Sequence, residues 1–500
     1  MQHESTTSLS ALGKQIDRVR PLLIGTTAVC LLVSVALYNG YPTVFSDTGG
    51  YLLTGTTFIA FPPFRAPGYS MFTRFTSLDI SAWFTILAQA LIVVYVLQET
   101  CNYLIDGDRK FRELCLLASV IVLAALTSLP WLVSLIMPDV FAGVLFLSAF
   151  LLTFNNDLRR IERISLAAIL IISVSSHMSL LPIAGLFIVV IAALRFAVPR
   201  TQDAPSARSI LGWVLVPIIA SGLFTATLNR DLGLGFTVSP SRNDFMLANL
   251  FGDGMAEDYL KQNCPNDRFI SCRYLSSLPQ TAEEFLFRHP LYIELRQHSS
   301  EMEEIVRGTL SAYPGRFVLS SARETLQQLT ALRTADEIRS YGARDWNNGA
   351  LQRVFPGEIQ AFRNGKQFRD RLLPAGNAAA SIDTRVFWFS FAACLILAWT
   401  GQFERINMIF YSGIAFLVIN AAVCATFAGV FYRYQGRVAW IMPFCLTAYG
   451  CSLVGEWKRS SVGREPIPAE FEYDAALPAD SGAYAGAGQV SFTSEVQEES

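Results

Sequence analysis

Residues 21–52 of this chain read "PLLIGTTAVCLLVSVALYNGYPTVFSDTGGYL", and they decide the fold class. Residues 21–39 form an apolar run long enough to cross roughly 30 Å of hydrocarbon as a helix. The segment that follows carries one carboxylate, Asp47, with no Lys or Arg within ten residues on either side. The stretch therefore predicts a transmembrane helix that leads into an acidic loop at the bilayer surface.

The composition extends this prediction to the whole chain. Of 500 residues, 52% are hydrophobic and 16% are charged, and the mean hydropathy is +0.36, which is too apolar for a soluble protein of this size. We therefore expect an all-α polytopic membrane protein. A net charge of −2, with no basic domain, P-loop or GxGxxG fingerprint, argues against nucleic acid partners and nucleotide cofactors.

Ten apolar runs are predicted as transmembrane helices. They cover residues 21–39, 82–99, 113–130, 138–154, 164–177, 179–197, 209–228, 386–401, 406–428 and 437–455. The first run could instead be a cleaved signal peptide, because Lys14, Arg18 and Arg20 precede it and Ser34-Val35-Ala36 resembles a cleavage site.

Cations between these runs predict the orientation, since loops kept in the cytoplasm carry an excess of Lys and Arg. If every run crosses once, one side receives Lys14, Arg18, Arg20, Arg109, Lys110, Arg112, Arg159, Arg160, Arg163, Arg195, Arg200, Arg208, Arg405, Lys458, Arg459 and Arg464. We expect an inner-membrane protein with both termini in the cytoplasm. The predicted parts are a cytoplasmic N-terminus (1–20), helices 1–7 (21–228) with a first outer loop (40–81), a periplasmic segment (229–385), helices 8–10 (386–455) and a disordered cytoplasmic tail (456–500).

The segment 229–385 is predicted as a small, mostly helical domain inserted between helices 7 and 8. Charged residues return there, and apolar positions recur every three or four residues. Cys264 and Cys272 flank a Pro-Asn-Asp turn on the side predicted to be oxidising, which favours a local disulfide. No CxxC pair or His at ligand spacing accompanies them, so zinc is disfavoured.

Asp47 has three interpretations from its residue type. It could cap a short helix, it could be a solvated loop acid, or it could take a proton from a hydroxyl at a membrane-surface active site. The rest of the loop, "TGTTFIAFPPFRAPGYSMFTRF" (54–75), combines prolines and aromatic residues with Arg65. This composition is typical of a structured interfacial loop.

At these residues the sequence resembles the GT-C superfamily of integral-membrane glycosyltransferases, including the protein-mannosyltransferase and lipid A sugar-transferase types. "FSDTGGYL" (45–52) and "FRAPGYSMF" (64–72) stand where that superfamily has an acid, a tyrosine and a basic, proline-rich stretch. "MPDVFAG" (137–143) places Asp139 where the superfamily often has a second acid. The similarity covers residues 21 to about 155. The chain departs from the pattern in its inserted domain and in lacking the adjacent acidic pair of some subfamilies.

The resemblance implies an inverting transferase that takes a sugar from a polyprenyl phosphate in the bilayer. The acceptor would be a glycolipid, a glycan or a protein on the periplasmic face. Asp47 would be the catalytic base, and Asp139 a second catalytic residue that orients the acceptor or helps to hold a divalent cation. Tyr51, Arg65 and Tyr69 would bind substrate.

Two further arginines and a histidine are candidates for substrate binding. Arg433 and Arg437, in "GVFYRYQGRVAW" (429–440), lie where cations are otherwise scarce and would share one face of a helical turn. Guanidinium groups bind phosphate in a bidentate manner. Equally, they could reach lipid headgroups, with aromatic residues Tyr432, Tyr434 and Trp440 as interfacial anchors. His177, at a nearby outer turn, could contact substrate or be a hydrogen-bonded structural residue.

Two other classes of function stay open at this point. A transporter or flippase of envelope lipids would place charged groups near the midplane of its helices. A non-catalytic membrane scaffold would tolerate replacement of both Asp47 and Asp139.

Overall fold

The computed structural model describes residues 2–60, 65–197, 211–264, 269–333, 335 and 338–462. These residues are mostly helical, with no β-strand among them and one isolated bridge between Thr43 and Leu135. The chain divides into two units, 1–456 and 457–500, and the candidate site lies within the first. The predicted disordered tail lies outside the described residues from 463 onward.

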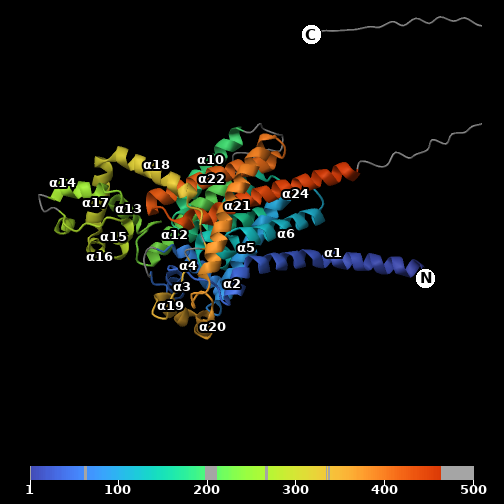
Figure 1. The fold of residues 1–500 in the computed structure, drawn as a ribbon, viewed down its shortest axis with the longest axis horizontal. Coiled ribbons are helices and arrows are strands. Elements are labelled where there is room, and N and C mark those ends of the chain that lie inside the picture. The colour runs from blue at the N-terminus through green and yellow to red at the C-terminus, as the bar shows by residue number, and fades with distance from the viewer. Residues whose placement is uncertain are drawn as a thin grey trace, which may run out of the picture. The chain divides into compact units, whose positions relative to one another are not determined.

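The helices follow one another along the chain as Figure 1 shows. The first part forms α1 (Gln2–Leu32), α2 (Ser34–Asn39), α3 (Thr48–Thr57), α4 (Pro67–Ser77), α5 (Ala82–Leu104), α6 (Arg109–Leu126), α7 (Leu129–Ser134), η1 (Pro138–Val140), α8 (Phe141–Phe154), α9 (Arg160–Ser176), α10 (Leu180–Ala197), η2 (Leu211–Leu215) and α12 (Val216–Asp231). The middle part forms α13 (Arg242–Gly252), α14 (Met255–Asn263), η4 (Ile270–Tyr274), α15 (Ala282–Phe287), α16 (Pro290–Gln297), α17 (Ser299–Ala312), α18 (Pro314–Thr330), α19 (Trp346–Val354), η6 (Pro356–Glu358) and α20 (Ile359–Asn364). The last part forms α21 (Leu373–Trp399), α22 (Glu404–Ala428), α23 (Tyr432–Ala439) and α24 (Ile441–Val462).

Helix occupies most of each of the ten predicted apolar runs. Within the described residues, five helical stretches are long and apolar enough to cross a membrane: Ala82–Leu104, Gly212–Asp231, Leu373–Trp399, Glu404–Ala428 and Tyr432–Ser461. Two apolar helices are shorter, Pro138–Phe154 and Leu180–Ala193. The chain is therefore all-α with the helices expected of a membrane protein, and a total of ten spans stays a prediction.

Two boundaries differ from the sequence prediction. The first run is split into α1 and α2, and α2 ends at Gly40, whose φ of 88° is the left-handed conformation that glycine adopts readily. The eighth helix, α21, begins at Leu373 and not near residue 386. Its first turns are too polar to register as an apolar run, yet Pro374 suits a first helical turn and the following alanines favour helix.

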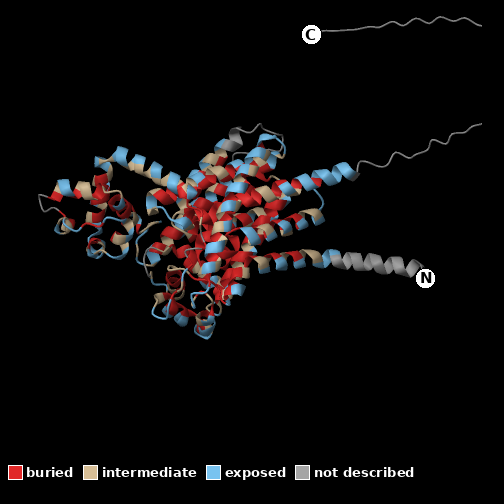
Figure 2. Ribbon diagram, in the orientation of Figure 1, coloured by how far each residue is buried: buried red, intermediate tan, exposed pale blue. Residues whose placement is uncertain are grey.

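The described residues of the inserted segment 229–385 contribute to two hydrophobic cores, and a separate inserted domain stays a prediction. Among the described residues, α13–α17 enclose a second hydrophobic core, and the Cys264–Cys272 disulfide, with a Cα–Cα distance of 5.3 Å, links the end of α14 to η4. Figure 2 shows this second group of buried residues beside the main core. In contrast, α18 packs along α22, and Gln367 hydrogen-bonds both backbone groups of Val44 in the first outer loop. The sequence pattern marked helices but could not assign each to its core.

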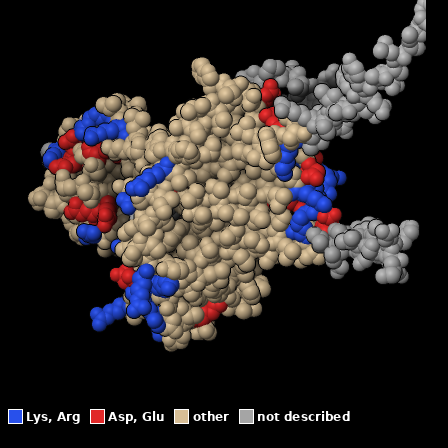
Figure 3. Space-filling model, turned by 45° about the vertical axis from the view of Figure 1, so that its right-hand side comes forward, with Lys and Arg blue, Asp and Glu red and all other residues tan. Residues whose placement is uncertain are grey.

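Charged side chains gather away from the apolar helix surfaces. Figure 3 shows a broad face without Lys, Arg, Asp or Glu between groups of charged residues. Ion pairs near residues predicted to be cytoplasmic link α1 to the start of α6, through Arg20–Glu113 at 2.7 Å and Lys110–Asp17 at 3.1 Å, and link α22 to the loop before α6, through Arg405–Asp106 at 3.7 Å. Large apolar side chains such as Leu91 and Phe389 are exposed on the candidate spans. This distribution suits contact with lipid.

Candidate functional site

Close helix packing positions the first outer loop. The Gly49 N–H donates to Asn347 Oδ1 at 2.7 Å, and a Cβ added at Gly49 would lie 2.9 Å from that oxygen. A Cβ added at Gly68 would lie only 2.2 Å from the carbonyl oxygen of Ser175. Glycine thus lets α3 meet α19 and lets α4 meet α9. This packing fixes the charged residues that precede each loop helix.

Asp47 occupies the N-cap position of α3, but within the described chain its side chain makes no capping hydrogen bond. Its Oδ1 instead accepts a hydrogen bond from Arg65 Nη2 at 2.6 Å, and its Oδ2 lies 3.5 Å from Arg433 Nη1. The side chains of Asp47, Arg65 and Arg433 are 16%, 14% and 11% exposed. Asp47 is therefore neither a helix cap nor a solvated acid, but part of a half-buried charge cluster.

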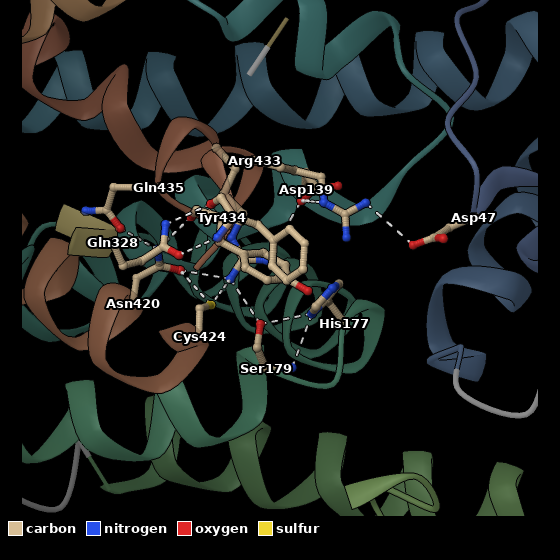
Figure 4. A network of polar contacts seen from close by, with 12 residues as sticks. Asp47, Asp139, His177, Ser179, Gln328, Asn420, Cys424, Arg433, Tyr434 and Gln435 are labelled. Carbon is tan, nitrogen blue, oxygen red and sulfur yellow. Dashed lines mark hydrogen bonds and ion pairs between the residues drawn. The ribbon is translucent and has the colours of Figure 1, made fainter. Parts of the chain in front are cut away.

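Asp139 joins the same cluster from η1. Its Oδ1 lies 3.8 Å from Arg433 Nε and 3.9 Å from Arg437 Nη1, and its side chain is 1% exposed. The guanidinium of Arg433 consequently contacts both aspartates (Figure 4). Three arginines, including Arg65, against two aspartates give the cluster one net positive charge. We refer to these five residues as the charge cluster.

The arginines of α23 point into the protein. Arg433 and Arg437 lie four residues apart on one short helix, and the Arg437 side chain is fully buried. Tyr434 and Trp440 are also buried, and Tyr432 alone of the three aromatic residues is exposed. This burial disfavours the interpretation that the two arginines reach bulk lipid headgroups, which lie at the outer surface.

Hydrogen bonds to neighbouring helices hold Arg437. Its Nη2 donates to Asn420 Oδ1 at 2.8 Å and to Ser179 Oγ at 3.0 Å. His177 Nδ1 lies 2.9 Å from the same Ser179 Oγ, and its ring stands edge-on to Tyr434 at 6.0 Å. His177 thus touches the charge cluster through Ser179, the geometry of a hydrogen-bonded structural residue.

The two predicted tyrosines pack together beneath the loop. Tyr51 and Tyr69 make an edge-to-face contact at 5.0 Å, and both are buried. Burial raises the pKa of the Tyr51 hydroxyl, so this group stays neutral and can donate a hydrogen bond. The Tyr69 hydroxyl donates to Gln89 Oε1 at 2.7 Å, which gives Tyr69 a structural partner.

The sequence analysis missed the polar residues that hold the site together, which are Gln89, Ser179, Gln328, Asn420, Cys424 and Gln435. Gln328 of α18 donates to the Phe431 carbonyl at 2.8 Å and accepts from the Phe431 N–H at 2.9 Å. Asn420 donates to the carbonyl of Tyr434 at 2.7 Å. A lone amide in an apolar run was the one available signal, and Gln89 and Asn420 offered it.

A divalent cation has no evident ligand set here. In the part of the chain that the structure describes, no three His, Cys, Asp or Glu residues come together as metal ligands. Asp47 and Asp139 are both opposed by guanidinium groups, which would repel a cation. The donor set therefore does not fit the divalent cation that the family resemblance allowed.

Comparison with known proteins gives no match: no family model, no curated protein and no solved structure is similar to this chain. The resemblance to the GT-C superfamily therefore stands on the motifs quoted above.

Proposed function

We propose that this protein is a GT-C-like membrane glycosyltransferase that moves a sugar from a polyprenyl phosphate to a glycolipid, glycan or protein acceptor. The charge cluster carries this proposal, because Asp47 and Asp139 share Arg433 although they come from distant parts of the sequence. The net positive charge of the cluster suits a substrate that brings a phosphate. The partial exposure of Asp47 leaves that side open to substrate.

The proposed reaction is a single inverting displacement. Asp47 accepts the proton of the acceptor hydroxyl while that oxygen attacks the anomeric carbon of the donor sugar. The bond between this carbon and the phosphate oxygen breaks, and the polyprenyl phosphate leaves with the electron pair. Arg65 and Arg433 stabilise the negative charge on the leaving phosphate.

We place the charge cluster at the periplasmic ends of ten spans in the inner membrane, with both termini in the cytoplasm and α13–α17 in the periplasm. The chain order supports this orientation. Asp47 follows α2, Asp139 precedes α8 and Arg433 follows α22. Arg20 directly precedes the apolar part of α1, and Lys110 and Arg405 lie in the first turns of α6 and α22, as expected if these positions face the cytoplasm.

The proposal is tested by mass spectrometry of envelope glycolipids and glycans from a deletion strain. The strain is complemented with wild type, Asp47→Asn or Asp79→Asn at matched expression. Asp79 is the control because it lies near the same loop but pairs with Arg74 outside the charge cluster. We expect the deletion to remove the mass of one sugar from one product, and Asp47→Asn alone to fail in restoring it.

Two results would reject the proposal. Full restoration by Asp47→Asn would point to a scaffold, because no base is then required. Loss of a whole glycolipid from the outer face, with each sugar intact in what remains, would point to a transporter or flippase.

A further inference from the structure

Asp139 and Arg437 carry four buried polar atoms without hydrogen-bond partners among the described residues, and we call the 3.9 Å separation of the two side chains the gap. Among the described residues, neither carboxylate oxygen of Asp139 has a hydrogen-bond partner, and neither Nε nor Nη1 of Arg437 has one. The closest approach, from Arg437 Nη1 to Asp139 Oδ1, is 3.9 Å, which exceeds a hydrogen-bond distance. Buried polar groups are nearly always hydrogen-bonded. The pair therefore retains hydrogen-bonding capacity for a group that does not belong to the chain.

The chemistry of the gap selects a hydroxyl. A group in the gap must accept from the guanidinium N–H of Arg437 and donate to the carboxylate of Asp139, and a hydroxyl does both. An oxygen about 2.8 Å from each atom fits between two atoms 3.9 Å apart. A phosphate oxygen is disfavoured there, because it could not donate and would lie against a carboxylate of like charge.

The gap lies next to the position proposed for the phosphate. Arg433 contacts Asp139 through Nε at 3.8 Å and Asp47 through Nη1 at 3.5 Å, so one guanidinium spans both acids. A hydroxyl between Asp139 and Arg437 is consequently within reach of a sugar whose phosphate lies beside Arg65 and Arg433. We propose that this gap binds one hydroxyl of the transferred sugar and so distinguishes the sugar-bearing lipid from bare polyprenyl phosphate. The inference rests on the proposed function.

Binding measurements on the full-length protein in nanodiscs test this subsite. The probes are undecaprenyl phosphate and a panel of undecaprenyl phosphates that carry one hexose, pentose or aminosugar. In Asp139→Leu we expect the affinity for the preferred sugar-bearing lipid to fall about tenfold or more, since a hydrogen bond to a charged group is lost. The affinity for bare undecaprenyl phosphate should change less than about twofold. Asp139→Asn keeps the shape and one acceptor oxygen, so its affinity for the sugar-bearing lipid should lie between those of wild type and Asp139→Leu.

Asp383→Asn is the matched control. Asp383 is a buried carboxylate, 1% exposed, but it lies on α21 outside the charge cluster. This variant should leave both affinities unchanged. It separates the effect of the subsite from the general effect of altering a buried carboxylate.

The possible results are distinct. An equal loss of affinity for both lipids in the Asp139 variants would overturn the subsite. Asp139 and Arg437 would then act on the phosphate or on folding. Unchanged discrimination in Asp139→Leu would overturn it too and would assign the gap to an ordered water. A wild-type protein that binds both lipids equally rejects the subsite alone. A wild-type protein that binds neither rejects the proposed function together with the subsite.

Discussion

Glycine at position 68 is required where α4 meets α9. A Cβ there would lie 2.2 Å from the backbone carbonyl oxygen of Ser175, and a backbone atom cannot rotate away. We expect Gly68→Ala to destabilise the protein by about 1–3 kcal/mol, the usual cost of overpacking. Gly185→Ala is the control, because no described atom lies within 4 Å of its added Cβ and alanine favours helix. Equal melting temperatures in one detergent would contradict the close contact.

The charged residues of the site are recognisable from the sequence, but their pairing is not. A charge at the edge of an apolar run stands out, and so both aspartates and all three arginines could be chosen. The partners of Asp47 lie 18 residues away at Arg65 and 386 residues away at Arg433. No local pattern encodes such distances. The role of Ser179 was missed for the same reason, because serine is a common residue and its hydroxyl gives no local sign of its partners.

The contact between α18 and α23 holds the arginine-bearing helix at its start. Gln328 bonds both backbone groups of Phe431, directly before α23. Gln328→Ala should raise the amide hydrogen-exchange rate across residues 431–439, because the first turn of α23 loses its anchor. Gln327→Ala, on the exposed side of α18, is the control. Identical exchange in both variants and wild type would show that Gln328 does not restrain α23.

Glu324 on α18 predicts a pH dependence of stability. Burial, aided by the nearby carboxylate of Asp253, raises the pKa of Glu324 to about 7. The folded state therefore holds this proton more tightly than the unfolded state does. Its contribution is present at low pH and is lost as the pH rises from the ordinary pKa of 4.5 through about 7.

The melting temperature of wild type relative to Glu324→Gln should therefore fall between about pH 5 and about pH 8. Thermal unfolding of both proteins in the same buffers measures the difference. Curves that stay parallel over this range would show that Glu324 titrates normally.

Helix positions were easier to predict than helix partners. Apolar runs located most of the helices of the bundle, since hydropathy reports burial in lipid or core directly. The start of α21 was missed because residues 373–385 mix small residues with Asn, Ser, Asp, Thr and Arg and so do not form an apolar run, although they are helical in the fold. Hydropathy also could not show that α18 packs on α22 or that Gln367 bonds Val44, because these partners lie far away in the sequence.

At the scale of the whole molecule, the disulfide reports the orientation of the chain. Cys264 and Cys272 should resist alkylation until the protein is reduced, because the proposed topology places them on the oxidising side. Cys30, a free cysteine, is the internal control and should be alkylated without reduction once the protein is denatured. Mass spectrometry of the digested protein measures the alkylation of all three cysteines. Free thiols at positions 264 and 272 in protein from cells would contradict a periplasmic segment.

The central claim is that the charge cluster transfers a sugar with Asp47 as the base. The most direct measurement mixes the purified protein with the sugar-deficient product isolated from the deletion strain and with the polyprenyl-phosphate lipids of that strain. We predict that wild type adds the mass of one sugar, with the anomeric configuration inverted relative to the donor, and that Asp47→Asn adds none. No gain of mass with wild type, or an equal gain with Asp47→Asn, would contradict this account.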